Sequence, residues 1–164
     1  MRQKHFRAVE ATHEPWPLAQ RPGFLIRRLH QIHVALFQQA CAEFEVTPLQ
    51  YSLLSALAAR KTADQTTLAA DIALDRTTTT GALKRLEARH LVERPVNAED
   101  RRARLCRLTK AGAHLLAKIE GAARSAHEAT LQGLSARERT QFVAMMQRIV
   151  AQNANQDTEA PSLE

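Results

Sequence analysis

The sequence contains few of the residues that interrupt helices or build aromatic cores. Of its 164 residues, 5 are glycine and 6 are proline, and aromatic residues make up 4%. Scarce glycine and proline favour long helices joined by few turns. The hydrophobic content of 45% is still enough for the core of one domain, and that core must consist mainly of leucine, alanine, isoleucine and valine.

Long apolar runs and a cysteine framework are also missing. No run reaches the length of a membrane span, and the opening stretch MRQKHFRAVEATHEPW has no apolar segment of a secretory signal. The two cysteines, Cys41 and Cys106, lack metal-type spacing and fit a reducing compartment better than a disulfide framework. We therefore expect a cytoplasmic protein with no metal and no other cofactor.

The motifs of common enzymes are absent as well, so we do not expect an enzyme. No Ser/His/Asp or Cys/His set stands at a motif spacing, and no glycine-rich phosphate loop is present. His30 and His33 could begin a metal site, but no second pair of ligands is evident, and structural histidines are expected. Cys41 lies on the apolar side of its helix and, like Cys106, is expected to be a buried thiol rather than a redox sensor.

The positive charge, by contrast, is concentrated in one window. The chain has 23 basic and 17 acidic residues, a net charge of +6. The segment 76–110 holds ten basic and four acidic residues, so the rest of the chain is neutral. An excess of charge in one short window is typical of a surface that binds a polyanion. The alternative is a solvated basic face without a partner.

Helical periodicity dominates the chain before this window. Residues 1–20 are polar and read as an arm, and the stretch 24–44 carries an apolar stripe wide enough to pack in its own subunit and against a second chain. Thr47, Pro48 and Gln50 form a capping box before the next helix. A short helix over 63–73, capped by Thr66, and a second one capped by Asp75 have helix-turn-helix spacing.

After His90 the pattern changes to alternation and then returns to helix. LVERPV and RLCRLT read as two strands joined by the polar loop NAEDRRA. Thr109 is a candidate cap for the helix that follows, and Ser135 with Glu138 forms a capping box for the last one. The tail from Asn153 is polar and is expected to be disordered.

Four consecutive threonines open the helix that follows Asp75, although threonine is a mediocre helix former. On a wheel at about 100° per residue, Thr79, Ala82, Leu83 and Leu86 form the core face. The opposite face is small, hydroxylic and basic, and consists of Thr77, Gly81, Lys84 and Ala88. Such a face suits a DNA groove, because threonine can bond phosphates or base edges and can touch a thymine methyl group. The alternative is an ordinary polar helix start.

The polar loop supports the interpretation as a DNA-binding surface. Arg101, Arg102 and Arg104 stand at or beside the tip of a two-stranded ribbon directly after this helix. An arginine-rich hairpin can reach the neighbouring minor groove, whose negative potential attracts arginine. Asp100 is interpreted as an internal partner that holds Arg102 or Arg104 in place. The alternative is a solvated hairpin tip.

At this point the sequence resembles the MarR family of bacterial winged-helix regulators over nearly the whole chain from Gly23. The resemblance rests on LDRTTTTGALKRLEARHLVER, on VTPLQYSLL and on the wing DRRARLCRLTKAG, whose specific positions are Asp100, Arg102, Leu108, Thr109 and Gly112. It implies a dimer built from the first and the last two helices. It also implies that Thr77, Thr78, Lys84 and Arg85 face DNA and that Arg102 enters the minor groove.

Pattern and resemblance together predict a mainly α fold with a small two- or three-stranded β wing. The expected parts are an arm (1–20), a helical dimerisation lobe (21–46 and 110–152), a winged helix-turn-helix domain (47–109) and a disordered tail (153–164). The full set of expected DNA contacts is Thr66, Arg76, Thr77, Thr78, Thr80, Lys84, Arg85, Arg101, Arg102 and Arg104.

The resemblance also implies an effector pocket between the first two helices and the winged domain. The stretch PGFLIRRLHQ is similar to a branch of the family that often answers to small aromatic acids. Phe24 and Tyr51 offer stacking faces, Arg28 could hold a carboxylate, and Trp16 could cover the site from the arm. Each could equally be a core aromatic or a surface arginine.

The function predicted is a sequence-specific, DNA-binding transcriptional regulator, a homodimeric repressor released from a pseudo-palindromic operator by a small aromatic carboxylate. Two alternatives stay open: an architectural DNA-binding protein without effector, and an interaction module whose wing binds another acidic partner.

Overall fold

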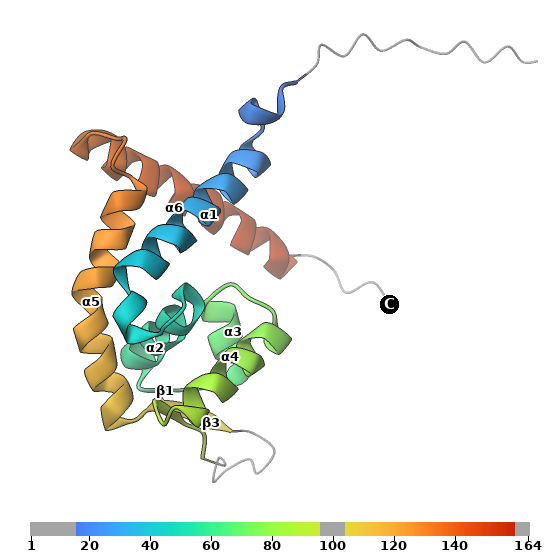
Figure 1. The fold of residues 1–164 in the computed structure, drawn as a ribbon. Helices are drawn as coiled ribbons and strands as arrows, with labels where there is room; N and C mark the ends of the chain where they lie inside the picture. The colour runs from blue at the N-terminus through green and yellow to red at the C-terminus, as the bar shows by residue number, and fades with distance from the viewer. Residues whose placement is uncertain (1–15, 96–103, 160–164) are drawn as a thin grey trace, which may run out of the picture.

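The computed structural model describes residues 16–95 and 104–159, with side chains in the last helix through Asn153. It is mainly helical with a small sheet, as predicted (Figure 1). The elements in chain order are η1 (Leu18–Gln20), α1 (Pro22–Ala40), η2 (Ala42–Phe44), α2 (Pro48–Arg60), β1 (Thr62–Asp64), α3 (Gln65–Asp71), α4 (Arg76–Ala88), β2 (Val92–Glu93), β3 (Leu105–Leu108), α5 (Lys110–Thr130) and α6 (Ala136–Glu159).

The sheet has three antiparallel strands in the order β1-β3-β2. β3 is central: Cys106 pairs with Ala63 of β1, and Leu108 pairs with Val92 of β2. The two strands expected around the wing are confirmed, although shorter than the apolar alternation suggested. β1 corrects the prediction of a helix starting at Ala63, because Ala63 is buried in the strand pairing with Cys106 and the helix begins only at Gln65.

The core of the winged-helix half lies between the sheet and the three helices α2, α3 and α4. Leu54, Leu68, Leu83 and Cys106 are fully buried in it, one from each surrounding element. Burying such side chains stabilises the fold by about 1.5–3 kcal/mol for each large aliphatic one. This half therefore closes its core with its own residues.

A second core joins α1 to α5. Phe37 and Cys41 from the first helix and its end meet Ile119 and Ala123 from the fifth, and all four are buried. Figure 1 shows α5 running along one side of the molecule, from the sheet up to the start of α6. Leu115 packs against both cores. α5 is therefore the element that connects the two halves.

The junction between the wing and α5 depends on a close backbone approach. Thr109 caps α5, and its hydroxyl also donates to the carbonyl of His90 at 2.7 Å. A Cβ atom placed on Gly112 would lie 2.0 Å from the carbonyl oxygen of Leu91, far inside van der Waals contact. Only glycine fits at this position, which explains its place in the wing motif.

α6 turns back from the end of α5 and leaves its apolar residues uncovered (Figure 1). Ile26 on α1 is 69% exposed and Val150 on α6 is 68% exposed. The other large apolar side chains left open on these two helices are Leu25, Ile32, Val143, Met145, Met146 and Ile149. We refer to these eight residues as the open apolar face.

The helix caps expected from local spacing are confirmed in four places. Thr47 and Gln50 form the reciprocal capping box of α2, and Asp75 accepts from the Thr78 N–H at the start of α4. Thr109 accepts from the Gly112 N–H. At α6, the Ser135 N–H donates to Glu138, whose own N–H donates back to the Ser135 hydroxyl at 3.4 Å.

Three boundaries differ from the prediction. α1 ends at Ala40, four residues before the predicted end, because the chain continues as the 3-10 helix η2. It then turns at Glu45, whose φ is 52°, and Phe44 packs against the second core. The cap of α3 is Asp64 rather than Thr66. The last helix continues through the segment expected to be disordered, as far as Glu159, and Pro161 is the first residue after it that disfavours helix.

Candidate nucleic-acid interface

α4 is fixed by its N-terminal turn and its buried side. The Asp75 carboxylate accepts from the N–H of Thr78 at 2.8 Å, and the Thr79 hydroxyl donates to the Asp75 carbonyl at 2.9 Å. The bonds from Thr78 hold the pKa of Asp75 below its usual value. Thr79, Leu83 and Leu86 are fully buried. The core face predicted from the wheel is confirmed.

The opposite face of α4 is free of bulky apolar groups. Thr77, Lys84 and Ala88 are exposed, and Gly81 is partly exposed between them. A Cβ atom on Gly81 would meet only the end of the Arg85 side chain, at 3.7 Å. Within the chain a methyl group would therefore fit at Gly81, and the face carries the cationic Lys84 with no bulky apolar side chain. A flat, basic helix face can lie against a phosphate backbone or in a major groove.

The residues that flank this face are of two kinds: some are exposed to solvent, and one has its hydroxyl bonded within the protein. Arg76, Thr78 and Arg85 are exposed. Thr80 is half-buried, and its hydroxyl donates to the Arg76 carbonyl at 2.6 Å and accepts a short bond from the Gln65 amide. The structure therefore uses the Thr80 hydroxyl to join α3 to α4.

A polar network behind the helix was not predicted from the sequence. Arg94, just after β2, has a side chain that is 10% exposed. Its guanidinium meets the Gln65 side-chain oxygen at 3.3 Å and Glu87 at 3.5 Å, and its Nε, which is buried, has no hydrogen-bond partner among the described residues. These contacts tie the root of the wing to both helices of the helix-turn-helix. The sequence did contain one sign of this inward position. In the alternating stretch LVERPV, Arg94 falls on the same side as Val92, which is buried.

The arginines expected at the wing tip are only partly within the structure. Arg104 is exposed at the start of β3, and its Nη1 donates to the Arg94 carbonyl at 3.3 Å. Arg101, Arg102 and their expected partner Asp100 lie outside the described residues. Arg107, further along β3, pairs with Glu93 across the sheet at 2.6 Å.

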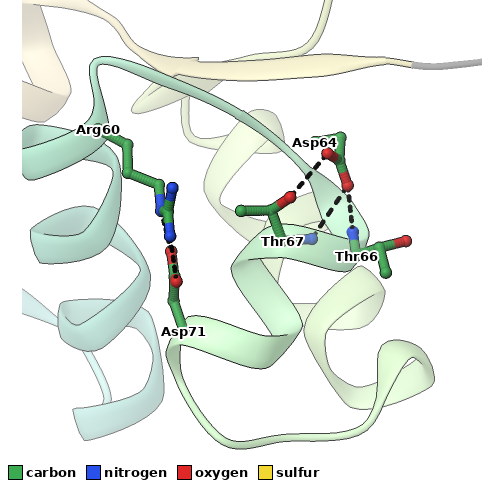
Figure 2. A network of polar contacts seen from close by, with 5 residues as sticks. All are labelled: Arg60, Asp64, Thr66, Thr67 and Asp71. Carbon is green, nitrogen blue, oxygen red and sulfur yellow. Dashed lines mark hydrogen bonds and ion pairs between the residues drawn. The ribbon is translucent and has the colours of Figure 1, made fainter. Parts of the chain in front are cut away.

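Thr66, the remaining expected DNA contact, stands at the exposed start of α3 (Figure 2). Its N–H and that of Thr67 both donate to the carboxylate of Asp64, at 2.8 and 3.0 Å. The bonds from Thr67 are the main cause that holds the pKa of Asp64 below its usual value. The start of α4 is held near the start of α3 by the bonds that Gln65 makes to it.

The four residues expected to bind an effector are not brought together within this chain. Tyr51 lines a groove between α2 and the end of α3. Arg28 is exposed on α1, Phe24 stacks with the Arg27 guanidinium, and Trp16 is 57% exposed beside Arg21. None of these three is among the described residues that line the groove.

The two cysteines are buried, and His33 packs against other side chains. Cys41 and Cys106 are buried, as expected, and burial raises the pKa of both thiols. His33 stacks on His127 at 4.6 Å between ring centres and lies 3.0 Å from the Thr130 hydroxyl. Burial lowers the pKa of His33, and the neighbouring His127 and His30 lower it further. Within residues 16–95 and 104–159, no three His, Cys, Asp or Glu side chains gather as metal ligands would.

The strand order, the helix-turn-helix and the exposed face of α4 define a winged helix-turn-helix DNA-binding protein. The model of the MarR family matches residues 46–103. The HTH-type transcriptional repressor NicR of Pseudomonas putida is 31% identical over 141 residues, covering 86% of this chain and 89% of NicR. The chain therefore belongs to the MarR family of transcriptional regulators.

Two solved structures are similar over most of the fold. BpsR of Bordetella bronchiseptica, whose DNA binding is regulated by 6-hydroxynicotinic acid, has a TM-score of 0.79 at 30% identity, with 84% of this chain and 98% of BpsR covered. PcaV of Streptomyces coelicolor in complex with its natural ligand has a TM-score of 0.77 at 32% identity, with 84% and 97% covered. In the described part of this chain no helix is long and apolar enough to cross a membrane.

Proposed function

We propose that this protein is a dimeric transcriptional repressor that binds a pseudo-palindromic operator and is released by a small aromatic carboxylate. The observation that carries the proposal is the exposed face of α4, with Thr77 and Lys84 opposite the buried Thr79 and Leu83. The similarity to the repressor NicR and to BpsR adds the function class and the kind of effector.

The dimer is supported by the open apolar face. Isolated exposed apolar residues are ordinary, but several on the same face of a helix favour an interaction site. The apolar residues of α6 recur at helical spacing, at 143, 146 and 150 and at 145 and 149, which gives one continuous stripe. A second copy offers the matching stripe by two-fold symmetry. The lobe that the sequence predicted from α1, α5 and α6 would then be completed by its partner.

DNA recognition divides between α4 and the wing. In the proposed complex, Thr77 and Thr78 read base edges in the major groove, and the cationic side chains bind phosphates. These cations are Arg76, Lys84 and Arg85. At the wing, Arg102 enters the minor groove with Arg101 and Arg104 beside it, and Asp100 orients the arginines. Thr66 and Thr80 are the remaining proposed contacts, Thr80 through its methyl group because its hydroxyl is engaged.

Selection of bound sequences from a pool of random duplexes tests the DNA-binding part of the proposal. A two-fold dimer selects a site with two inverted half-sites whose centres are about one helical turn apart. Light scattering on the same preparation gives twice the mass of the chain. A monomer at micromolar concentration, or selection of a single unpaired half-site, contradicts the proposal.

The effector site is proposed around Tyr51, in the groove between α2 and α3. Tyr51 is half-buried, and its ring packs against Phe37 at 5.5 Å, so it gives the groove one fixed aromatic wall. In the dimer, Phe24 and Trp16 supply further aromatic surface. A carboxylate needs a cation, and two arginines qualify: Arg28 on α1 and Arg60 inside the groove.

Titration of aromatic acids into the protein–DNA complex tests the effector part. Fluorescence anisotropy of a labelled selected duplex is followed while 6-hydroxynicotinate, 4-hydroxybenzoate and nicotinate are added. Because a coupling of about 1–3 kcal/mol is typical, release corresponds to an affinity for DNA that is about 5–150-fold weaker. If no acid releases DNA at millimolar concentration, the protein is an architectural DNA-binding protein or answers to another class of ligand.

A further inference from the structure

Arg94 stands at the root of the wing, directly after β2, and its side chain points into the protein. That side chain is only 10% exposed, whereas Arg104 and Arg107 on the neighbouring strand are exposed. Arginine is seldom buried, because removal of the guanidinium from water costs free energy that its partners must offset. The position of Arg94 is therefore costly, and its contacts show what the cost supports.

The Arg94 guanidinium contacts both helices of the helix-turn-helix. Its Nη2 donates to Oε1 of Gln65, the first residue of α3, at 3.3 Å, and its Nη1 lies 3.5 Å from Oε2 of Glu87 near the end of α4. The Gln65 amide in turn donates to the carbonyl of Arg76, at 3.4 Å, and to the hydroxyl of Thr80. One chain of contacts therefore joins the wing root to both ends of α4.

α4 is a firm base for the wing root. Its side chains Thr79 and Leu83 are fully buried in the core, and Asp75 caps its first turn. Thr80 and Glu87 are seven residues apart, so they lie on one side of the helix, about 10 Å apart along its axis. Because the contacts reach the helix near both points, they fix the direction of the wing root relative to the α4 axis.

The backbone alone holds the wing root lightly. β2 has two residues, and the pairing with β3 continues past Arg94 through a bond from the Leu105 N–H to the Pro95 carbonyl at 3.1 Å. Proline has no N–H with which to return that bond. The Arg104 side chain adds a bond to the Arg94 carbonyl at 3.3 Å. The Arg94 side chain therefore supplies a link from this root to α3 and α4 that the strand pairing does not.

The contacts of Arg94 suit geometry better than stability. Its charge partner Glu87 is 43% exposed, and its own Nε is buried with no hydrogen-bond partner in residues 16–95 and 104–159. Replacement of a buried charged group by an apolar side chain of similar volume is often neutral or stabilising. Glu87 stays in contact with water after such a replacement. We therefore expect methionine at this position to leave the free energy of unfolding nearly unchanged.

We propose that Arg94 is a positioning residue for DNA recognition, which sets the orientation of the wing relative to α4. Binding needs α4 in the major groove and the wing at the neighbouring minor groove at the same time. Without the Arg94 side chain both surfaces persist, but the wing root moves more freely, and ordering it on DNA then costs affinity. The inference rests on the proposed division of DNA contacts between α4 and the wing.

Fluorescence anisotropy of the full-length protein with the duplex selected from the random pool tests this role. Arg94→Met should weaken binding about tenfold, while the melting temperature by circular dichroism stays within about 3 °C of the wild type or rises. Arg94→Lys keeps the charge but lacks the planar fork that spans Gln65 and Glu87, so it should recover only part of the loss. Arg107→Met is the matched control, because Arg107 lies on the same sheet and pairs with Glu93 instead, and it should change binding little.

Double-mutant cycles separate positioning from a merely structural role. A wing that is no longer held gains less from Arg104, so Arg94→Met and Arg104→Gln together should weaken binding by less than the product of their separate effects. Lys84→Gln acts through α4, and its effect should multiply with that of Arg94→Met.

Two results would overturn the inference and leave the proposed function standing. One is an Arg94→Met variant that binds as tightly as the wild type. The other is a pair of cycles that are both multiplicative, which would mean that Arg94 does not act through the wing. If Arg104→Gln alone leaves the affinity unchanged, the wing makes no contribution through this residue, and the proposed wing contacts fall together with the inference.

Discussion

The winged-helix half and the helical lobe bury their apolar side chains in different ways. The winged-helix half, α2 to β3, closes around fully buried leucines from three helices and buried residues of the sheet. The lobe of α1, α5 and α6 buries one cluster between α1 and α5 and leaves the open apolar face to solvent. The first half has a closed core within the single chain, whereas the second leaves an apolar surface that a partner would cover in the proposed dimer.

This difference shows that the period of an apolar pattern and the width of its stripe carry different information. Both halves have apolar residues at helical spacing, so periodicity alone describes them equally well. They differ in the width of the stripe: α1 and α6 have apolar residues on more of their circumference than their own chain covers. An apolar stripe wider than its intramolecular contact therefore indicates an interface, and the stability of such a region depends on protein concentration.

The largest expected effect is on the open apolar face. Ile149→Glu places a charge in the centre of the proposed dimer interface, where an unpaired buried charge costs about 3–5 kcal/mol in each chain. We expect a folded monomer in light scattering, with DNA binding at least tenfold weaker. Ala144→Glu, on the opposite side of α6, is the matched control and should remain dimeric. A dimeric Ile149→Glu variant would remove the contrast between the two halves.

The next effect concerns the closed core. Leu83 is fully buried, and Leu83→Ala should lower the free energy of unfolding by about 2–5 kcal/mol. Ile26 is 69% exposed, and Ile26→Ala should change the free energy of unfolding by less than about 0.5 kcal/mol. Both substitutions are made in the monomeric Ile149→Glu background. Urea denaturation with a common slope gives both values. Similar losses would mean that Ile26 is already buried within the monomer.

A smaller effect is expected on the DNA-facing side of the winged-helix half. Lys84→Gln should weaken binding to random duplex DNA by about tenfold at low salt. It should also reduce the slope of log affinity against log salt by about 0.9 for each phosphate that the side chain no longer neutralises. Lys118→Gln, an exposed lysine of α5, is the control for net charge. The same slope in both variants would show that α4 does not lie on the phosphate backbone.

The smallest effect is a pH dependence confined to the lobe. The pKa of His33 is below its ordinary value because of burial and its histidine neighbours, so the unfolded chain binds the proton more readily. Stability should therefore fall as the pH drops through about 6.5. The melting temperature measured on either side of this value, at about pH 5.5 and 7.5, should differ less in His33→Gln than in the wild type. His114→Gln, an exposed histidine of α5, should keep the full difference.

The sequence was most informative where structure is decided by neighbours in the chain. The caps Thr47, Asp75 and Thr109 and the buried face of α4 follow from spacing within one turn, and all are confirmed. β1 was not predicted because its residues become a strand only by pairing with β3, which lies far along the chain. Local propensity contains no information on such a partner.

The polar groups behind the site could not be predicted for the same reason. Arg94 meets Gln65 across 29 positions, and Arg60 meets Asp71 from a different helix. The alternation with Val92 could have shown that Arg94 points inward, but not that Gln65 is its partner, and Arg60 and Asp71 each read as an ordinary surface charge. The sequence favours Arg28 as the carboxylate anchor because it lies close to an aromatic residue in the chain. The packing of α2 on α3 places Tyr51 in a groove that Arg28 does not line.

The glycine at the start of α5 has a mechanical consequence. Where the Gly112 backbone touches the Leu91 carbonyl, no side chain lies between them to cushion a movement. α5 has 21 residues and is about 30 Å long, so a tilt of the whole helix would have its fulcrum at this contact. A tilt of about 5° at the fulcrum would move the far end by about 3 Å, and in the proposed dimer a shift between the subunits would rotate the wing by the same geometry. Gly112→Ala would move the fulcrum itself.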